Sequence, residues 1–126
     1  MSKKTIRHPN RRVSTGAYSD AIQVGPWVFV SGCDALDLST KQIVGTTIEE
    51  QTKVALANVE AILGAAGLGM EHVVKCTAYL KRIEDFGRYN AVYERAFPDP
   101  KPARTTLEAD VGEGLLVEID AVAYRD

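Results

Sequence analysis

The sequence lacks a long apolar run, is poor in cysteine and carries almost no net charge, and each of these absences excludes a class of protein. No stretch approaches the roughly 18 consecutive apolar residues that a membrane-spanning helix requires. The basic start has no apolar segment behind it, so we expect no signal peptide. The two cysteines, Cys33 and Cys76, are far apart and match no disulfide or metal-binding pattern. Together these features predict reduced thiols and a cytoplasmic location.

A formal charge of −2 gives the chain no overall attraction for nucleic acid or for an anionic membrane. The charge is unevenly distributed, however, because five basic residues lie within residues 1–12: Lys3, Lys4, Arg7, Arg11 and Arg12. The rest of the chain therefore carries −7. A short basic arm of this kind is usually a solvated terminus, and contact with RNA or phosphate is the alternative.

Familiar catalytic and cofactor motifs are absent as well. The sequence contains no G-x-S-x-G elbow, P-loop, H-E-x-x-H or C-x-x-C. His8 and His72 have no neighbours at ligand spacing, so we expect no metal site. The glycines of residues 64–69 end a helix instead of beginning one, which excludes a dinucleotide fingerprint. Ser31 has no partner that the sequence identifies as a base.

The 126 residues suffice for a single domain with one hydrophobic core. A capping box, Thr47 to Glu50, begins the clearest helix, and Gly67 is placed to end it. The pattern as a whole predicts an α+β fold of order ββαβαββ, with two helices on one face of a mixed sheet. We expect strands at residues 17–24, 27–33, 72–81, 103–109 and 115–124, and helices at 47–66 and 86–97.

The segment WVFVS, residues 27–31, is apolar on both of its alternating faces up to Ser31. Such a pattern is typical of a strand that is buried on both sides. Two helices cover one face of the predicted sheet, and the chain offers nothing to cover the other. We therefore expect an oligomer in which sheets pack against each other.

Two polar residues in apolar surroundings are candidates for binding. Arg104 opens a predicted strand directly after Pro102 and Ala103, and an arginine beside a buried strand needs an anion. That anion is either the carboxylate of a ligand or an acidic side chain of the protein itself. Asn90 shares a helix face with aromatic residues, where a buried amide usually makes a structural hydrogen bond.

Two further candidates are Glu118 and Tyr18. Glu118 and Asp120 occupy the middle of one face of the last strand, about 6–7 Å apart by strand geometry. This face is either half solvated, or it positions a carboxylate that orients or deprotonates a water molecule. Tyr18, near the start of the first predicted strand, is either a core aromatic residue or a lid over a site.

Five segments resemble the Rid (YjgF) family of reactive-intermediate deaminases, in order and over nearly the whole chain. The P-A-R and E-I-D-A motifs near the C-terminus are the most specific part of the resemblance. It implies a chorismate-mutase-like α+β fold and a homotrimer, with the sheets packed inward and sites in the clefts between subunits. The segments are TGAYSDA (15–21), VFVSG (28–32), NVEAILGAAG (58–67), KPARTT (101–106) and VEIDAVA (117–123).

The resemblance also implies an activity, the hydrolysis of 2-imino or enamino acids to 2-oxo acids and ammonia without a metal or organic cofactor. Arg104 matches the family arginine that grips the substrate carboxylate, and Glu118 matches the glutamate that activates water. Tyr18 matches a site tyrosine, while the backbone amides of Gly32 and Thr106 would hold the carboxylate and the imine.

The chain departs from the family pattern beside this site. Ser31-Gly32-Cys33 replaces the usual S-G-Q, Ala17 replaces a proline, and Thr106 stands where cysteine is common. These differences bear on substrate choice, so another enamine, such as an aminomuconate-like intermediate, is an alternative substrate. Cys33 is either a plain buried cysteine or a modifiable thiol. An RNA-binding or translation-inhibiting protein, and a trimer that binds small ligands without turnover, are the alternative functions.

Overall fold

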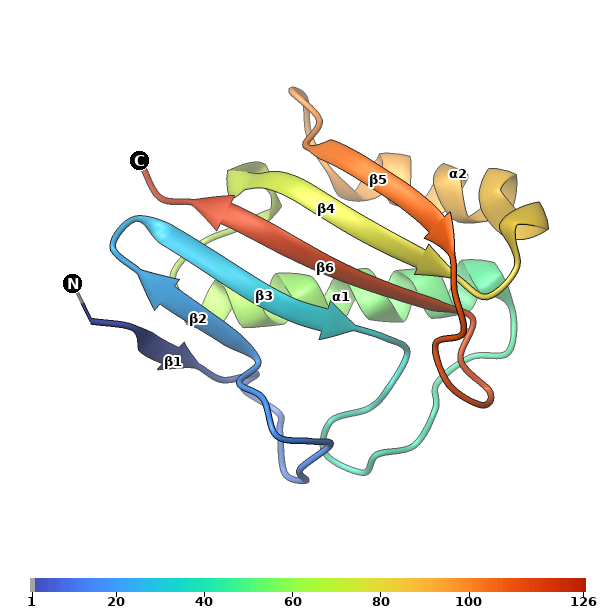
Figure 1. Ribbon diagram of the computed structural model, residues 1–126, viewed down its shortest axis with the longest axis horizontal. Coiled ribbons are helices and arrows are strands. Elements are labelled where there is room, and N and C mark those ends of the chain that lie inside the picture. Colours follow the sequence, from blue (N-terminus) through green and yellow to red (C-terminus); the bar gives the residue numbers. More distant parts are fainter. Residues whose placement is uncertain (1) are drawn as a thin grey trace.

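The computed structural model, which describes residues 2–126, is a six-stranded sheet with two helices packed on one of its faces (Figure 1). The strand order is β1-β2-β3-β6-β4-β5, in which β4 and β5 are parallel and all other neighbours antiparallel. The mixed sheet and its helix layer confirm the predicted fold class. The strands are β1 (Lys4–Ile6), β2 (Ala21–Val24), β3 (Trp27–Cys33), β4 (Val73–Leu80), β5 (Ala103–Glu108) and β6 (Val117–Tyr124), and the helices are α1 (Ile48–Ala65) and α2 (Phe86–Ala96), with short 3-10 turns at Met70–His72 and Ile83–Asp85.

The N-terminal part of the chain differs from the prediction in two ways. Strand β1 lies inside the basic arm and pairs with β2, so the arm is not simply a solvated terminus. The buried side chain of Ile6 anchors it. In addition, β2 begins only at Ala21, which leaves Tyr18 in a loop instead of the predicted strand.

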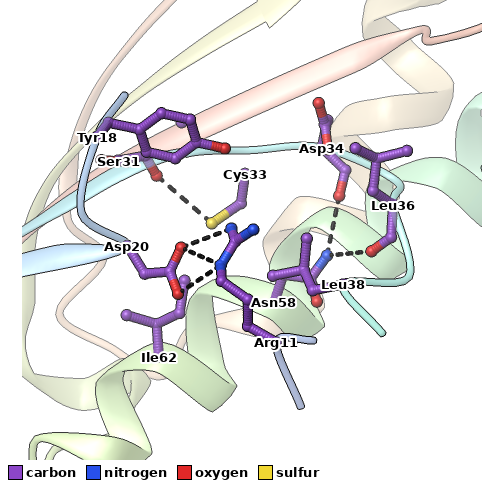
Figure 2. A pocket seen from close by; sticks show the side chains of 11 residues that line it. Arg11, Tyr18, Asp20, Ser31, Cys33, Asp34, Leu36, Leu38, Asn58 and Ile62 are labelled. Carbon is purple, nitrogen blue, oxygen red and sulfur yellow. Dashed lines mark hydrogen bonds and ion pairs between the residues drawn. The ribbon is translucent and has the colours of Figure 1, made fainter. Parts of the chain in front are cut away.

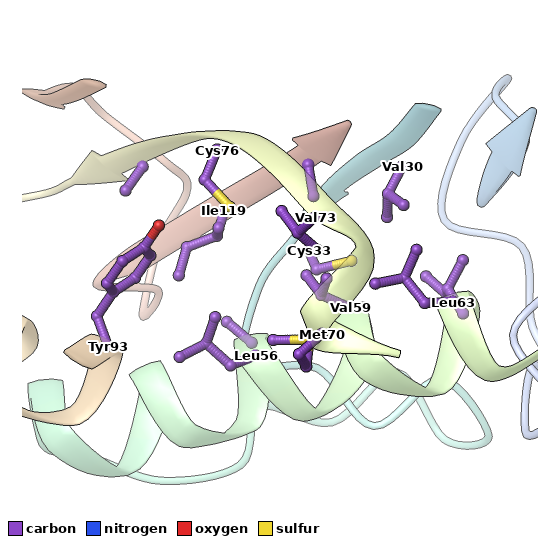
Figure 3. Packing of buried hydrophobic residues seen from close by; sticks show 14 of the residues in the cluster. Val30, Cys33, Leu56, Val59, Leu63, Met70, Val73, Cys76, Tyr93 and Ile119 are labelled. Atoms are coloured by element: carbon purple, nitrogen blue, oxygen red, sulfur yellow. The ribbon is translucent and has the colours of Figure 1, made fainter. Parts of the chain in front are cut away.

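The hydrophobic core lies between α1 and the inner face of the sheet (Figure 3). The capping box of Thr47 and Glu50 is present, and the predicted apolar stripe of α1 is buried. Both cysteines are free thiols within this core. The stripe and the strand residues that it contacts form one continuous cluster, which includes Ala55, Val59, Ile62, Leu63, Val28, Val30, Ala78, Ile119 and Ala121.

The opposite face of the sheet is uncovered in the single chain. Trp27 and Phe29 of β3 are 41% and 47% exposed, and Tyr124 of β6 packs its ring against Trp27 with centroids 4.8 Å apart. The prediction that both faces of residues 27–31 are dry therefore fails within one chain. Neither helix in residues 2–126 is both long and apolar enough to cross a membrane.

Candidate functional site

Arg104 lies on β5 and faces the helix layer, because its β4 neighbour in the register is the buried residue Cys76. Its Nη1 donates hydrogen bonds to Oδ1 of Asn90 at 2.7 Å and to the hydroxyl of Tyr89 at 3.5 Å. Nε and Nη2 donate to no protein atom among residues 2–126, and no carboxylate in that range lies within 4.0 Å. The alternative of an internal salt bridge is therefore wrong, and Arg104 is a half-buried cation without an anion.

Aromatic side chains of α2 and its start surround the guanidinium of Arg104. Its central carbon lies 4.6 Å from the ring centroid of Tyr93, 5.6 Å from that of Tyr89 and 5.4 Å from that of Phe86. Such contacts stabilise the cation and leave its N–H edge free for a planar anion. Phe86 and Tyr93 are among the aromatic residues that share the predicted helix face with Asn90, but their contact with Arg104 was not predicted. The only signal for it was the presence of an arginine on a neighbouring predicted strand.

Asn90 and Thr106 complete this group, which we call the arginine half-site (Arg104, Thr106, Asn90, Tyr89). A buried amide most often ties a helix to a loop, but Asn90 instead accepts a hydrogen bond from Arg104 and orients it. The hydroxyl of Thr106 lies 3.2 Å from that of Tyr89. A surface cleft of about 420 Å³ opens beside Arg104 and Asn90.

Glu118 lies on the uncovered face of the sheet, opposite Tyr79 in the register of β4 and β6. Its carboxylate rests against the backbone of Gly32, since a Cβ atom added there would lie only 2.3 Å from Oε2. Glycine is therefore required for this close approach. The carboxylate of Glu118 accepts no hydrogen bond from a side chain or backbone group of residues 2–126, so it is free to bind water.

A bulge in β3 produces this approach. Val30 pairs with Ala121 and Cys33 pairs with Ile119, so β3 has one residue more than β6 between these two pairs. Bulges of this kind redirect side chains and are frequent beside active sites. Here the bulge exposes Gly32 and returns Cys33 to the core.

The side chain of Cys33 faces the core, and that of Ser31 is engaged in a hydrogen bond within the protein. Cys33 is buried in the core, where burial, with smaller contributions from acidic neighbours, raises the pKa of its thiol well above the usual value. It is therefore a plain buried cysteine. The hydroxyl of Ser31 donates to the carbonyl of Ser19 at 2.6 Å and fixes the loop that carries Tyr18. We call Tyr18, Ser31, Gly32 and Glu118 the glutamate half-site.

The surroundings of the Glu118 carboxyl group raise its pKa above the usual value. Partial burial raises the pKa of Glu118, and the negative charges of Asp34 and Asp120 raise it further. Asp120 is itself held by the backbone N–H of Thr77 at 3.1 Å and by the hydroxyl of Tyr79 at 3.3 Å. Glu118 is thus the carboxylate suited to exchange a proton, and no local pattern in the sequence indicates the influence of Asp34 on it.

The two half-sites lie on opposite faces of the sheet within one chain. Arg104 faces the helices, like its neighbour Cys76, whereas Glu118 faces the uncovered side, like its neighbour Tyr79. The structure therefore does not bring these two residues together in a single chain. Residues 2–126 also hold no group of three or more His, Cys, Asp or Glu side chains placed to bind a metal ion.

Comparison with known proteins places the chain in a family. Residues 9–125 match the family described as Endoribonuclease L-PSP. The chain belongs to this family, which is also called the YjgF or Rid family. A RutC family protein of Pyrococcus abyssi is 40% identical to this Rid protein over 127 aligned positions, which cover all of both chains.

Two further relatives of the Rid protein carry more specific descriptions. The 2-iminobutanoate/2-iminopropanoate deaminase of Mus musculus is 38% identical over 124 residues, covering 98% of this chain and 92% of its own. The crystal structure of E. coli TdcF with bound serine superimposes with a TM-score of 0.89 at 28% identity, covering 98% of this chain and 99% of the other. This likeness confirms the fold expected from the resemblance.

Proposed function

We propose that this Rid protein hydrolyses 2-imino and enamino acids of the 2-aminoacrylate type to 2-oxo acids and ammonia, at a site shared by two chains. The observation that carries the proposal is the half-buried guanidinium of Arg104, which has aromatic support and no carboxylate partner among residues 2–126. The deaminase name of the mouse relative and the serine bound to TdcF support a small amino-acid-like substrate.

In the proposed reaction, Nε and Nη2 of Arg104 bind the substrate carboxylate and fix the adjacent imine carbon. Glu118 from a second chain takes a proton from water as the water oxygen bonds to that carbon. The proton then passes to the nitrogen, which gives a carbinolamine. When the remaining proton of the hydroxyl group also moves to the nitrogen, the C–N bond breaks, the C=O bond of the 2-oxo acid forms and ammonia leaves. Backbone amides of Gly32 and Thr106 hold the carboxylate and the imine, and Tyr18 closes the site.

The assay that tests this proposal generates an imino acid in situ and follows the 2-oxo acid with and without the protein. We expect faster release of the 2-oxo acid when the protein is present. If no imino acid or aminomuconate-like enamine reacts faster, the proposal is wrong. Tight binding of a 2-oxo acid would then indicate a trimer that binds ligands without turnover. Salt-sensitive RNA binding that is lost when Lys3, Lys4 and Arg7 are replaced by Gln would instead indicate an RNA-binding protein.

A homotrimer would bury the uncovered sheet face and could join the two half-sites. We expect Phe29→Glu to prevent assembly, because it places a charge in the middle of an apolar interface. The mass in solution, measured by light scattering, should fall from three chains to one, and imine hydrolysis should be lost with it. Ala57→Glu adds the same charge to the exposed side of α1 and should leave both unchanged. Normal assembly of Phe29→Glu would contradict this interface.

The acid side of the pH–rate profile tests the role of Glu118. The enzyme loses activity as the pH falls through the pKa of its base, because the base becomes protonated. Removing the negative charge of Asp34 should lower the pKa of Glu118 and so move this loss to lower pH. We expect this shift in kcat for Asp34→Asn, which retains an oxygen acceptor. Asp37→Asn, in the same loop but absent from the environment of Glu118, is the matched control. An identical profile for Asp34→Asn would mean that Glu118 is not the titrating base.

A further inference from the structure

A buried ion pair lies directly beneath the loop that carries Tyr18. Nε of Arg11 donates to both carboxylate oxygens of Asp20, at 2.9 and 3.0 Å, and Nη2 lies 2.6 Å from Oδ1 (Figure 2). The two side chains are only 12% and 4% exposed. Burial alone would raise the pKa of Asp20, but hydrogen bonds from Arg11 and from the backbone N–H of His8 bring it below the usual value.

The remaining side-chain hydrogen bonds of Arg11 go to the loop of residues 13–19. Nη1 donates to the carbonyl of Val13 at 2.8 Å and to the hydroxyl of Thr15 at 3.2 Å. That hydroxyl is in turn hydrogen-bonded to the hydroxyl of Tyr18, whose ring centroid lies 5.9 Å from the guanidinium carbon of Arg11. Tyr18 is 50% exposed, so Arg11 and Thr15, and not the core, determine its position.

The other end of the same loop is attached to the bulge of β3. The carbonyl of Asp20 accepts the backbone N–H of Ser31 at 2.9 Å, and the carbonyl of Ser19 accepts its hydroxyl at 2.6 Å. Ser31 directly precedes Gly32, against which Glu118 rests. The ion pair thus connects the loop of Tyr18 to the backbone beneath the catalytic carboxylate.

We propose that Arg11 and Asp20 are positioning residues, which hold Tyr18 and the Ser31–Gly32 backbone in register with Glu118 without touching the substrate. This inference rests on the proposed function. A buried ion pair often stabilises a fold less than apolar packing of equal volume would. The guanidinium of Arg11, however, donates to Asp20, Val13 and Thr15 at once. This suits the ordering of a loop that contains no helix or strand.

The test compares Arg11→Lys with wild type in imine hydrolysis. Lysine keeps a positive charge beside Asp20, so the protein should fold, but it cannot reach Asp20, Val13 and Thr15 together. We expect kcat to fall about 10-fold or more, with KM within about twofold because the arginine half-site is intact. Arg88→Lys is the matched control, since Arg88 forms a similar two-pronged but exposed pair with Glu49, at 2.9 and 2.8 Å.

A double variant separates positioning from a general loss of structure. If Arg11 acts through Tyr18, the fold-loss of kcat in the double variant Arg11→Lys/Tyr18→Phe should be smaller than the product of the fold-losses in the two single variants. Hydrogen exchange should show faster opening of residues 13–20 in Arg11→Lys, with α1 unchanged. A wild-type kcat in Arg11→Lys, or a fold-loss in the double variant equal to the product of the two single losses, would overturn the positioning role without affecting the proposed function. An inactive wild-type protein would instead defeat the proposed function.

Discussion

Replacement of Arg104 by lysine is expected to lower kcat/KM for imine hydrolysis by about 100-fold, because two charge-assisted hydrogen bonds to the substrate carboxylate become at most one. Each such bond contributes on the order of 1.5–3 kcal/mol. Lysine also cannot keep the planar contacts with the rings of Tyr93, Tyr89 and Phe86. Its ammonium group would attract the carboxylate without fixing its orientation.

Steady-state kinetics on an imino acid generated in situ measure this effect. Most of the loss should appear in KM, since the carboxylate is bound before and during the reaction. Arg95→Lys, on the same helix as Asn90 but away from Arg104, should behave as wild type. If Arg104→Lys retains activity within a few-fold of wild type, Arg104 does not bind the substrate carboxylate.

The second large effect concerns Glu118. Glu118→Gln keeps the size of the side chain but removes the base, so we expect a loss of kcat of about 100-fold or more. KM should change little, because the arginine half-site remains. Burial of an amide in place of the carboxylate should not unfold the protein, since Glu118 has no ion-pair partner among residues 2–126.

Mixing two inactive variants tests whether the site is divided between chains. Trimers reassembled from Arg104→Ala and Glu118→Gln chains contain one intact site whenever both variants are present. Random assembly from equal amounts should restore about a quarter of the wild-type activity. Each variant reassembled alone is the control and should stay inactive. Mixed trimers without recovered activity would mean that Arg104 and Glu118 do not act in one site.

Local patterns predicted the elements whose signals lie within a few residues of each other. The capping box of Thr47 and Glu50 and the apolar stripe after it define α1 without reference to the rest of the chain. Strand β1 was missed because three residues are too few for an alternating pattern, and its partner lies far along the chain. Tyr18 was placed in a strand because nothing local shows that the backbone before Ala21 bonds to Ser31.

Individual residues of the candidate site could be predicted from the sequence, but their arrangement on the two faces of the sheet could not. Alternation along β6 correctly separated Glu118 and Asp120 from the core face. The face of Arg104, however, depends on its register with Cys76, and the internal-anion alternative could be rejected only with all acidic side chains in place. Cys33 shares the parity of Trp27 and Phe29, which would put it on the uncovered face. The bulge places it in the core instead.

The extra residue in β3 constrains the length of the chain as well as its composition. One surface of β3 supplies the exposed aromatic side chains at its start, and the bulge then allows Cys33 to face the core a few residues later. Deletion of a single residue between Val30 and Cys33 would restore simple alternation and leave Cys33 on the core face, but it would remove the bulge and with it the exposed backbone of Gly32 on which Glu118 rests. Insertions and deletions in this short segment should therefore be tolerated far less well than substitutions, even though half of its residues face solvent.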